Sequence, residues 1–130
     1  MNKISKPLVI VFAVLMLIMG SLKRGIWAEE TQGQDAQSYK AAYRLVMEED
    51  WSKAASALDS FISTHPQSAY TDDAQYWRCY VKEKTDRSQE EVFTCYQNFI
   101  KAYPDSSWVD NAKSNLIRIA DRRAKQGKTE

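Results

Sequence analysis

Apolar side chains recur at intervals of three and four residues along most of the chain from Asp35 onward. This spacing is typical of amphipathic helices. No stretch alternates with a period of two for long enough to predict a strand. The pattern therefore predicts an all-α fold of five helices: Asp35–Glu49, Trp51–Thr64, a third before the break at Thr85–Ser88, Gln89–Ala102, and a fifth that runs into the basic tail before Gly127.

Two prolines mark the ends of predicted helices. Pro66 follows the second helix and Pro104 follows the fourth, and the residue before a proline is pushed out of the α region. Hydroxyl side chains that can cap a helix come after each break. The expected N-caps are Ser68 or Thr71 for the third helix, Ser88 for the fourth, and Ser106 or Ser107 for the fifth.

The segment from Phe61 to Ala74 is nearly repeated from Phe99 to Ala112. Six of the fourteen positions are identical at an offset of 38, where about one match is expected by chance. The identical pairs are Phe61/Phe99, Ile62/Ile100, Pro66/Pro104, Ser68/Ser106, Asp72/Asp110 and Ala74/Ala112. A fixed period of this size indicates a supersecondary unit stacked on copies of itself. We therefore predict a short α-solenoid of about two and a half helix-turn-helix units.

The residues at these helix positions resemble the tetratricopeptide repeat (TPR) family. The family places a small residue early in the second helix of each unit, then large apolar residues, then a proline. The matching residues are Ala54, Leu58, Phe61 and Pro66 in the first unit and Val92, Tyr96, Phe99 and Pro104 in the second. The small position of the family's first helix is matched by Ala42 and Cys79.

The resemblance covers about Gln34 to Lys125, and we assign a TPR-like domain to residues 35–126 with a short tail at 127–130. The sequence from Tyr103 to Ala112 is similar to the corresponding segment in a bacterial envelope subgroup of the family. That subgroup includes the lipoprotein of the barrel-assembly machinery and the cell-division coordinator associated with the Tol-Pal system. No cysteine near the end of the N-terminal apolar run could carry a lipid.

The first 28 residues have the layout of a secretory signal peptide. Lys3 and Lys6 precede an uninterrupted apolar run from Leu8 to Met19, and Ala28 precedes a polar segment, 29–34, that we interpret as a linker. This layout predicts export to the periplasm or another extracytoplasmic space. The alternative is a retained inner-membrane anchor formed by residues 7–22, although this run is shorter than the roughly 20 residues that span a bilayer.

The balance of charge does not suggest a nucleic-acid partner. The chain has 18 basic and 17 acidic residues. Residues 1–28 hold four of the basic residues and none of the acidic ones, so 14 basic and 17 acidic residues remain after them. A mildly acidic domain lacks the basic surface of a nucleic-acid-binding protein. The basic residues near the C-terminus are interpreted as a solvated helix end.

Cys79 and Cys95 are the two cysteines of the chain. They would lie opposite each other if the third and fourth helices form an antiparallel hairpin that turns near Arg87. An exported compartment permits disulfides, and closing a loop of this length would stabilise the fold by about 3 kcal/mol. The alternative is a pair of buried free thiols that act as small core residues. The spacing favours the disulfide.

The sequence contains no pattern that indicates an enzyme, a metal site or a cofactor. His65, the one histidine, lies before Pro66 at a helix end and is interpreted as a turn residue. The carboxylate pairs are adjacent in sequence, so their members point about 100° apart on a helix and read as helix-terminus charges. We therefore expect no catalytic residues, no metal ligands and no cofactor.

Four tyrosines repeat a helical spacing. Tyr39 and Tyr43 are four residues apart on the first helix, and Tyr76 and Tyr80 are four apart on the third. The resemblance implies that the first helix of each unit lines a concave surface where these rings would meet a peptide. The alternative is that the rings pack between neighbouring helices. The tryptophans Trp51, Trp77 and Trp108 are interpreted as packing anchors.

These observations lead to two hypotheses about function. In the first, the chain is an exported, non-enzymatic interaction module of the cell envelope. It binds a protein or peptide on its concave helical face through the four tyrosines, with Arg44 and Arg118 meeting acidic groups. In the second, it is a structural subunit that homo-oligomerises or forms the end piece of a larger assembly, because two and a half units are fewer than the three usually needed for stability.

Overall fold

The computed structural model describes residues 33–85 and 88–127. The predicted signal peptide, the alternative anchor and most of the predicted linker lie outside the described residues. From Asp35 onward the chain forms one compact unit. No helix within the described ranges is long and apolar enough to cross a bilayer.

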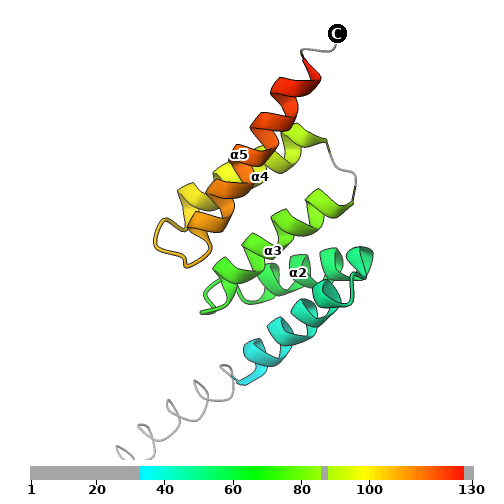
Figure 1. The fold of residues 1–130 in the computed structure, drawn as a ribbon. Coiled ribbons are helices and arrows are strands. Elements are labelled where there is room, and N and C mark those ends of the chain that lie inside the picture. Colours follow the sequence, from blue (N-terminus) through cyan, green and yellow to red (C-terminus); the bar gives the residue numbers. More distant parts are fainter. Residues whose placement is uncertain (1–32, 86–87, 128–130) are drawn as a thin grey trace, which may run out of the picture. The chain divides into compact units, whose positions relative to one another are not determined.

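The described residues form an all-α fold, which confirms the fold class (Figure 1). Five helical segments are present in them and no strand. Residues 33–47 are helical and are called the first helix below. The others are α2 (Trp51–Thr64), α3 (Thr71–Lys84), α4 (Gln89–Ala102) and α5 (Val109–Gln126). The helix ends at Thr64 and Ala102 are those predicted from the two prolines.

Successive helices pack on one another (Figure 1). Two buried clusters share α3. The first cluster joins the first helix, α2 and α3 through Ala42, Val46, Ala54, Leu58, Phe61, Ala74 and Val81. The second joins α3, α4 and α5 through Tyr76, Cys79, Val92, Tyr96, Phe99, Ala112 and Ile119. Each cluster contains one phenylalanine of the sequence repeat, so the two copies fill corresponding places in the core.

The sequence repeat is also a repeat of backbone hydrogen bonds. In the first copy, the N–H groups of His65, Ser68 and Thr71 donate to the carbonyls of Phe61, His65 and Ser68, at 2.8, 3.1 and 3.2 Å. The same three bonds recur 38 residues later, at Tyr103, Ser106 and Val109, with lengths of 2.9, 3.1 and 3.2 Å. One turn geometry therefore connects α2 to α3 and α4 to α5.

The predicted N-caps of α3 and α5 are wrong, while that of α4 is confirmed. Tyr70 and Trp108 occupy the cap positions, and neither side chain makes a cap hydrogen bond. The hydroxyls of Ser68 and Ser106 instead accept from the N–H groups two residues on, at 3.2 and 3.3 Å. Serine readily forms such local turns. In both turns the N-cap position is then occupied by an aromatic residue, whose ring packs against its neighbours. Ser88 caps α4 by accepting from the Glu91 N–H.

Glu49 ends the first helix in a left-handed conformation, with φ 58°. The Asp50 N–H donates to the Leu45 carbonyl at 3.0 Å and the Glu49 N–H donates to the Val46 carbonyl at 3.1 Å. These bonds are those of a Schellman motif, in which glycine is the favoured residue at the left-handed position. Glu49 therefore bears a steric cost that a glycine would not.

We expect Glu49→Gly to raise the free energy of unfolding by about 0.5–1 kcal/mol, because it removes the clash between Cβ and the following carbonyl. Urea denaturation of the full chain measures the change. Glu49→Ala is the matched control, since it removes the same carboxylate and keeps Cβ. Equal stability of the glycine and alanine variants would contradict the explanation.

Candidate functional site

The candidate site is a cluster of aromatic side chains contributed by the first helix, α3 and α5. We call it the aromatic face, and it consists of Tyr39, Tyr43, Trp77, Tyr80 and Trp108, each partly exposed. The ring centroids of Trp77 lie 5.1 Å from Tyr43, 5.5 Å from Tyr80 and 5.1 Å from Trp108. Trp77 therefore joins rings from the first helix and α5 into one continuous surface.

Tyr39 and Tyr76 occupy equivalent places in the two units. Tyr39 stacks on Tyr70 with centroids 5.0 Å apart, and Tyr76 stacks on Trp108 at 4.4 Å. Each also contacts the repeat phenylalanine of its own unit. Tyr76 is only 5% exposed and lies in the second buried cluster. Its ring thus packs between helices, which is the alternative that the sequence left open, and it lies beneath the aromatic face.

Tyr43 and Tyr80 have more accessible positions on the two sides of Trp77. Tyr43 contacts Tyr39 with centroids 6.1 Å apart, and Tyr80 contacts Trp51 at 6.2 Å. The ammonium of Lys84 lies 5.0 Å from the Tyr80 ring centroid, one turn further along α3. These contacts cover part of each ring and leave both tyrosines partly exposed.

The two arginines predicted to meet a partner, Arg44 and Arg118, differ in the ion pairs that they already form. The Arg44 side chain is 75% exposed and pairs with Glu48 at 3.3 Å, a pair within one helix. Exposed pairs of this kind are worth little and are easily exchanged for another anion. Arg118 pairs instead with Glu83 across the α3–α5 gap, with Nη1 2.6 Å from Oε1. Arg44 is therefore the freer cation.

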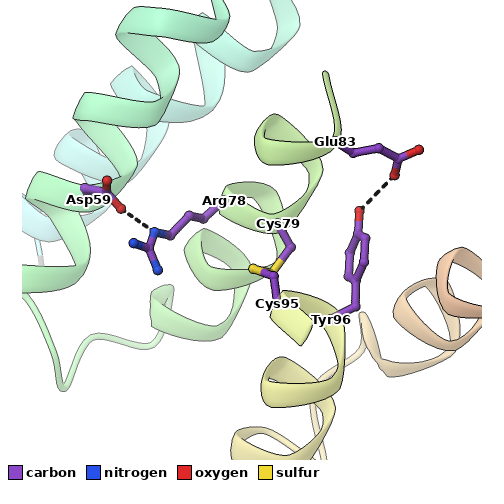
Figure 2. The surroundings of a disulfide bond; sticks show 6 residues. All are labelled: Asp59, Arg78, Cys79, Glu83, Cys95 and Tyr96. Atoms are coloured by element: carbon purple, nitrogen blue, oxygen red, sulfur yellow. Dashed lines mark hydrogen bonds and ion pairs between the residues drawn. A yellow bond between two sulfur atoms is a disulfide. The ribbon is translucent and has the colours of Figure 1, made fainter. Parts of the chain in front are cut away.

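Glu83 is the centre of a polar cluster next to the aromatic face. Its side chain is 13% exposed, and Arg122 also approaches it, at 3.2 Å. The Tyr96 hydroxyl donates to Glu83 Oε2 at 3.5 Å (Figure 2). Burial acts to raise the pKa of Glu83, but the hydrogen bonds and charges of Arg118 and Arg122 outweigh it and lower that pKa. The cluster ties α3, α4 and α5 together and gives Glu83 two cationic partners.

Cys79 and Cys95, which the sequence analysis expects to pair, are joined by a disulfide bond between α3 and α4 (Figure 2). Figure 2 also shows Arg78 of α3 pairing with Asp59 of α2. The disulfide borders a groove of about 530 Å³ between α3 and α4. Its α4 wall includes the exposed side chains Thr94 and Asn98.

The groove and the aromatic face lie on opposite sides of α3. Successive residues of a helix are rotated by about 100°, so Asp73, Trp77 and Tyr80 share one side. Gln75, Arg78 and Lys82, which line the groove, share the opposite side. Thr94 and Asn98, on the α4 wall of the groove, are therefore remote from the aromatic face, and their substitution serves as a control for substitutions in that face.

Two features bear on catalysis and metal binding in the part of the chain that the structure describes: the single histidine and the candidate metal ligands. The His65 ring lies 5.2 Å from the Phe61 ring at the end of α2. No group of three or more His, Cys, Asp or Glu side chains among the described residues is placed to hold a metal ion.

Trp77, Trp108 and Asp73 were not among the predicted site residues. Trp77 and Trp108 pack against the buried clusters, as predicted, and their partly exposed rings also contact each other. The Trp108 indole N–H donates to the Asp73 carboxylate, which links α5 to the first turn of α3. The 38-residue offset between Tyr70 and Trp108 was the signal that could have identified the stacking partners of Tyr39 and Tyr76.

Comparisons with known proteins give partial matches to two sequences. No protein-family model matches the chain. A stretch of 39 residues is 41% identical to the cell division coordinator CpoB of Pseudomonas putida strain KT2440, and a second CpoB sequence from the species gives the same match. The stretch is 30% of this chain and spans 15% of the length of CpoB.

Proposed function

We propose that the chain is an exported, non-enzymatic interaction module of the cell envelope that binds a protein or peptide partner through the aromatic face. The observation that carries the proposal is the continuous set of partly exposed rings around Trp77. Tyrosine and tryptophan are enriched in protein interfaces, because they combine a large apolar area with a polar group. A surface of this composition favours contact with another protein over chemistry.

The ring contacts support the proposal further, since they hold the surface in place before a partner arrives. Tyr43 and Tyr80 both rest on Trp77, and Trp77 rests on Trp108. Side chains that are already ordered lose little conformational entropy on binding. The rings also come from the first helix, α3 and α5, the helices that line the concave surface in the TPR family that the sequence resembles.

The match to CpoB supports an interaction role in general terms. CpoB is a cell division coordinator by name. Export is proposed from the N-terminal signal-like segment. Arg44, exposed beside Tyr43 in the chain, is the cation that we expect to meet an acidic group of the partner, whereas Arg118 would first have to leave Glu83.

We expect the double substitution Tyr43→Ala and Tyr80→Ala to remove the partner from the set captured by proximity labelling in the native envelope. The two rings are partly exposed, so their loss should reduce contact area more than stability. The matched control is Thr94→Ala with Asn98→Ala on the opposite side of α3, which should leave the partner set unchanged. Circular dichroism verifies that both variants remain helical. An unchanged partner set in the tyrosine variant would refute the proposal.

One observation favours the alternative, assembly through the end of the solenoid. Ile117 on α5 is 71% exposed, although it lies 38 residues after Cys79, which is 1% exposed and covered by α4. No described helix follows α5 to cover it in the same way. The solution mass distinguishes the two functions. A concentration-dependent dimer that Ile117→Ser abolishes would support assembly, and a stable monomer would oppose it.

A further inference from the structure

Asp73 carries a carboxylate that has no cationic partner among the described residues. It lies in the first turn of α3, is partly buried, and accepts a hydrogen bond from the Trp108 indole N–H. None of the described lysine or arginine side chains forms an ion pair with it. Burial raises the pKa of Asp73, and its hydrogen bond with Trp108 acts in the opposite direction. The helix N-terminus favours the charge but does not neutralise it.

Indole rings stand next to this carboxylate. Asp73 and Trp77 are four residues apart on α3 and therefore lie on the same side of the helix. The Trp77 and Trp108 rings have centroids 5.1 Å apart and an interplanar angle of 69°, so they meet edge to face. Trp108 thus contacts both the Asp73 carboxylate and the Trp77 ring. A carboxylate and two partly exposed indoles form one small site.

The negative charge at this end of the aromatic face has no counter-charge among the described side chains. Asp72 adds a second carboxylate next in the chain, and no described cation pairs with it either. Burial raises the pKa of Tyr39, and the charge of Asp73 acts in the same direction. Glu83, by contrast, is matched by Arg118 and Arg122.

We infer that the partner places an arginine side chain against Asp73, Trp77 and Trp108. The inference rests on the proposed function and names the chemistry of the partner at one end of the same face. A guanidinium is planar, stacks on aromatic rings and binds a carboxylate through paired N–H groups, so it satisfies the rings and the carboxylate at once. An apolar or acidic group here would leave Asp73 without a counter-charge.

N-acetyl-arginine amide tests this site without knowledge of the partner. It is titrated into the ¹⁵N-labelled full chain, and the indole N–H signals of Trp77 and Trp108 are followed by NMR. Saturable shifts are expected with this probe, and much smaller shifts with N-acetyl-citrulline amide, which has a similar shape and no charge. Asp73→Asn should weaken binding about tenfold, because it removes the charge-assisted hydrogen bonds.

The asparagine variant retains an oxygen that can accept from Trp108, and the equivalent position of the second unit, Asn111, is an asparagine already. Asp72→Asn is the matched control, since it removes the same charge one residue away, and it should weaken binding by less than about threefold. Equal shifts with citrulline, or unchanged affinity in Asp73→Asn, would overturn the inference.

The outcomes separate this inference from the proposed function. The double substitution Tyr43→Ala and Tyr80→Ala could abolish partner capture while the probe binds Asp73→Asn as tightly as the wild-type chain. In that case only the arginine inference is lost. If partner capture survives the tyrosine substitutions, the proposed function is lost whatever the probe does.

Discussion

Alanine at Phe61 or at Phe99 is expected to lower the free energy of unfolding by about 3–4 kcal/mol. The two rings are 2% and 3% exposed, and each lies in a different buried cluster. Each also contacts the stacked tyrosine of its unit, Tyr39 or Tyr76. Removing either ring leaves a cavity that the surrounding helices fill only in part, so the loss includes both the transfer of apolar area and the cavity.

Urea denaturation followed by circular dichroism measures both variants. Phe93→Ala is the control, because Phe93 is partly exposed on α4 and should cost much less. A loss in only one of the two repeat variants would contradict the view that the copies are structurally equivalent. A loss as large in Phe93→Ala would show that the method reports general damage to α4.

Loss of the Cys79–Cys95 disulfide is expected to lower the free energy of unfolding by about 3 kcal/mol. The bond links residues 16 apart in sequence and so restricts the unfolded chain. Replacing both cysteines by alanine avoids a buried hydroxyl at Cys79, which is 1% exposed. The midpoint of guanidinium denaturation should fall by the same amount in the double variant and in the reduced wild-type chain.

Addition of a reductant to the double alanine variant is the control, and it should change nothing. Identical unfolding of the oxidised and reduced wild-type chain would contradict a stabilising role for the bond. Alkylation of both thiols in the exported protein would show that the bond does not form there.

The helices were predictable because their signals are local. Apolar stripes at a spacing of three and four, and prolines after Thr64 and Ala102, specify the helical faces and ends without reference to the rest of the fold. The cysteine pairing followed from the same register, since two helices joined by a short break form a hairpin. The repeat added that one turn is used twice.

The exposure of individual rings was not predictable in the same way, because it depends on which neighbour covers each side chain. Tyr76 and Tyr80 are four residues apart on α3, as Tyr39 and Tyr43 are on the first helix, yet Tyr76 is buried under Trp108 while Tyr80 remains partly exposed. The N-caps failed for a related reason: Ser68 and Ser106 can form either a cap or a turn, and the packing of the following ring decides between them.

Site-specific photo-crosslinking in intact cells tests the central claim most directly. Benzoylphenylalanine is placed singly at Tyr43 and Tyr80 on the aromatic face, and at Thr94 and Asn98 in the groove on the opposite side of α3. The account predicts that illumination links the same partner to Tyr43 and Tyr80 and leaves Thr94 and Asn98 unlinked. Crosslinks confined to Thr94 and Asn98, or equal at all four positions, would contradict it.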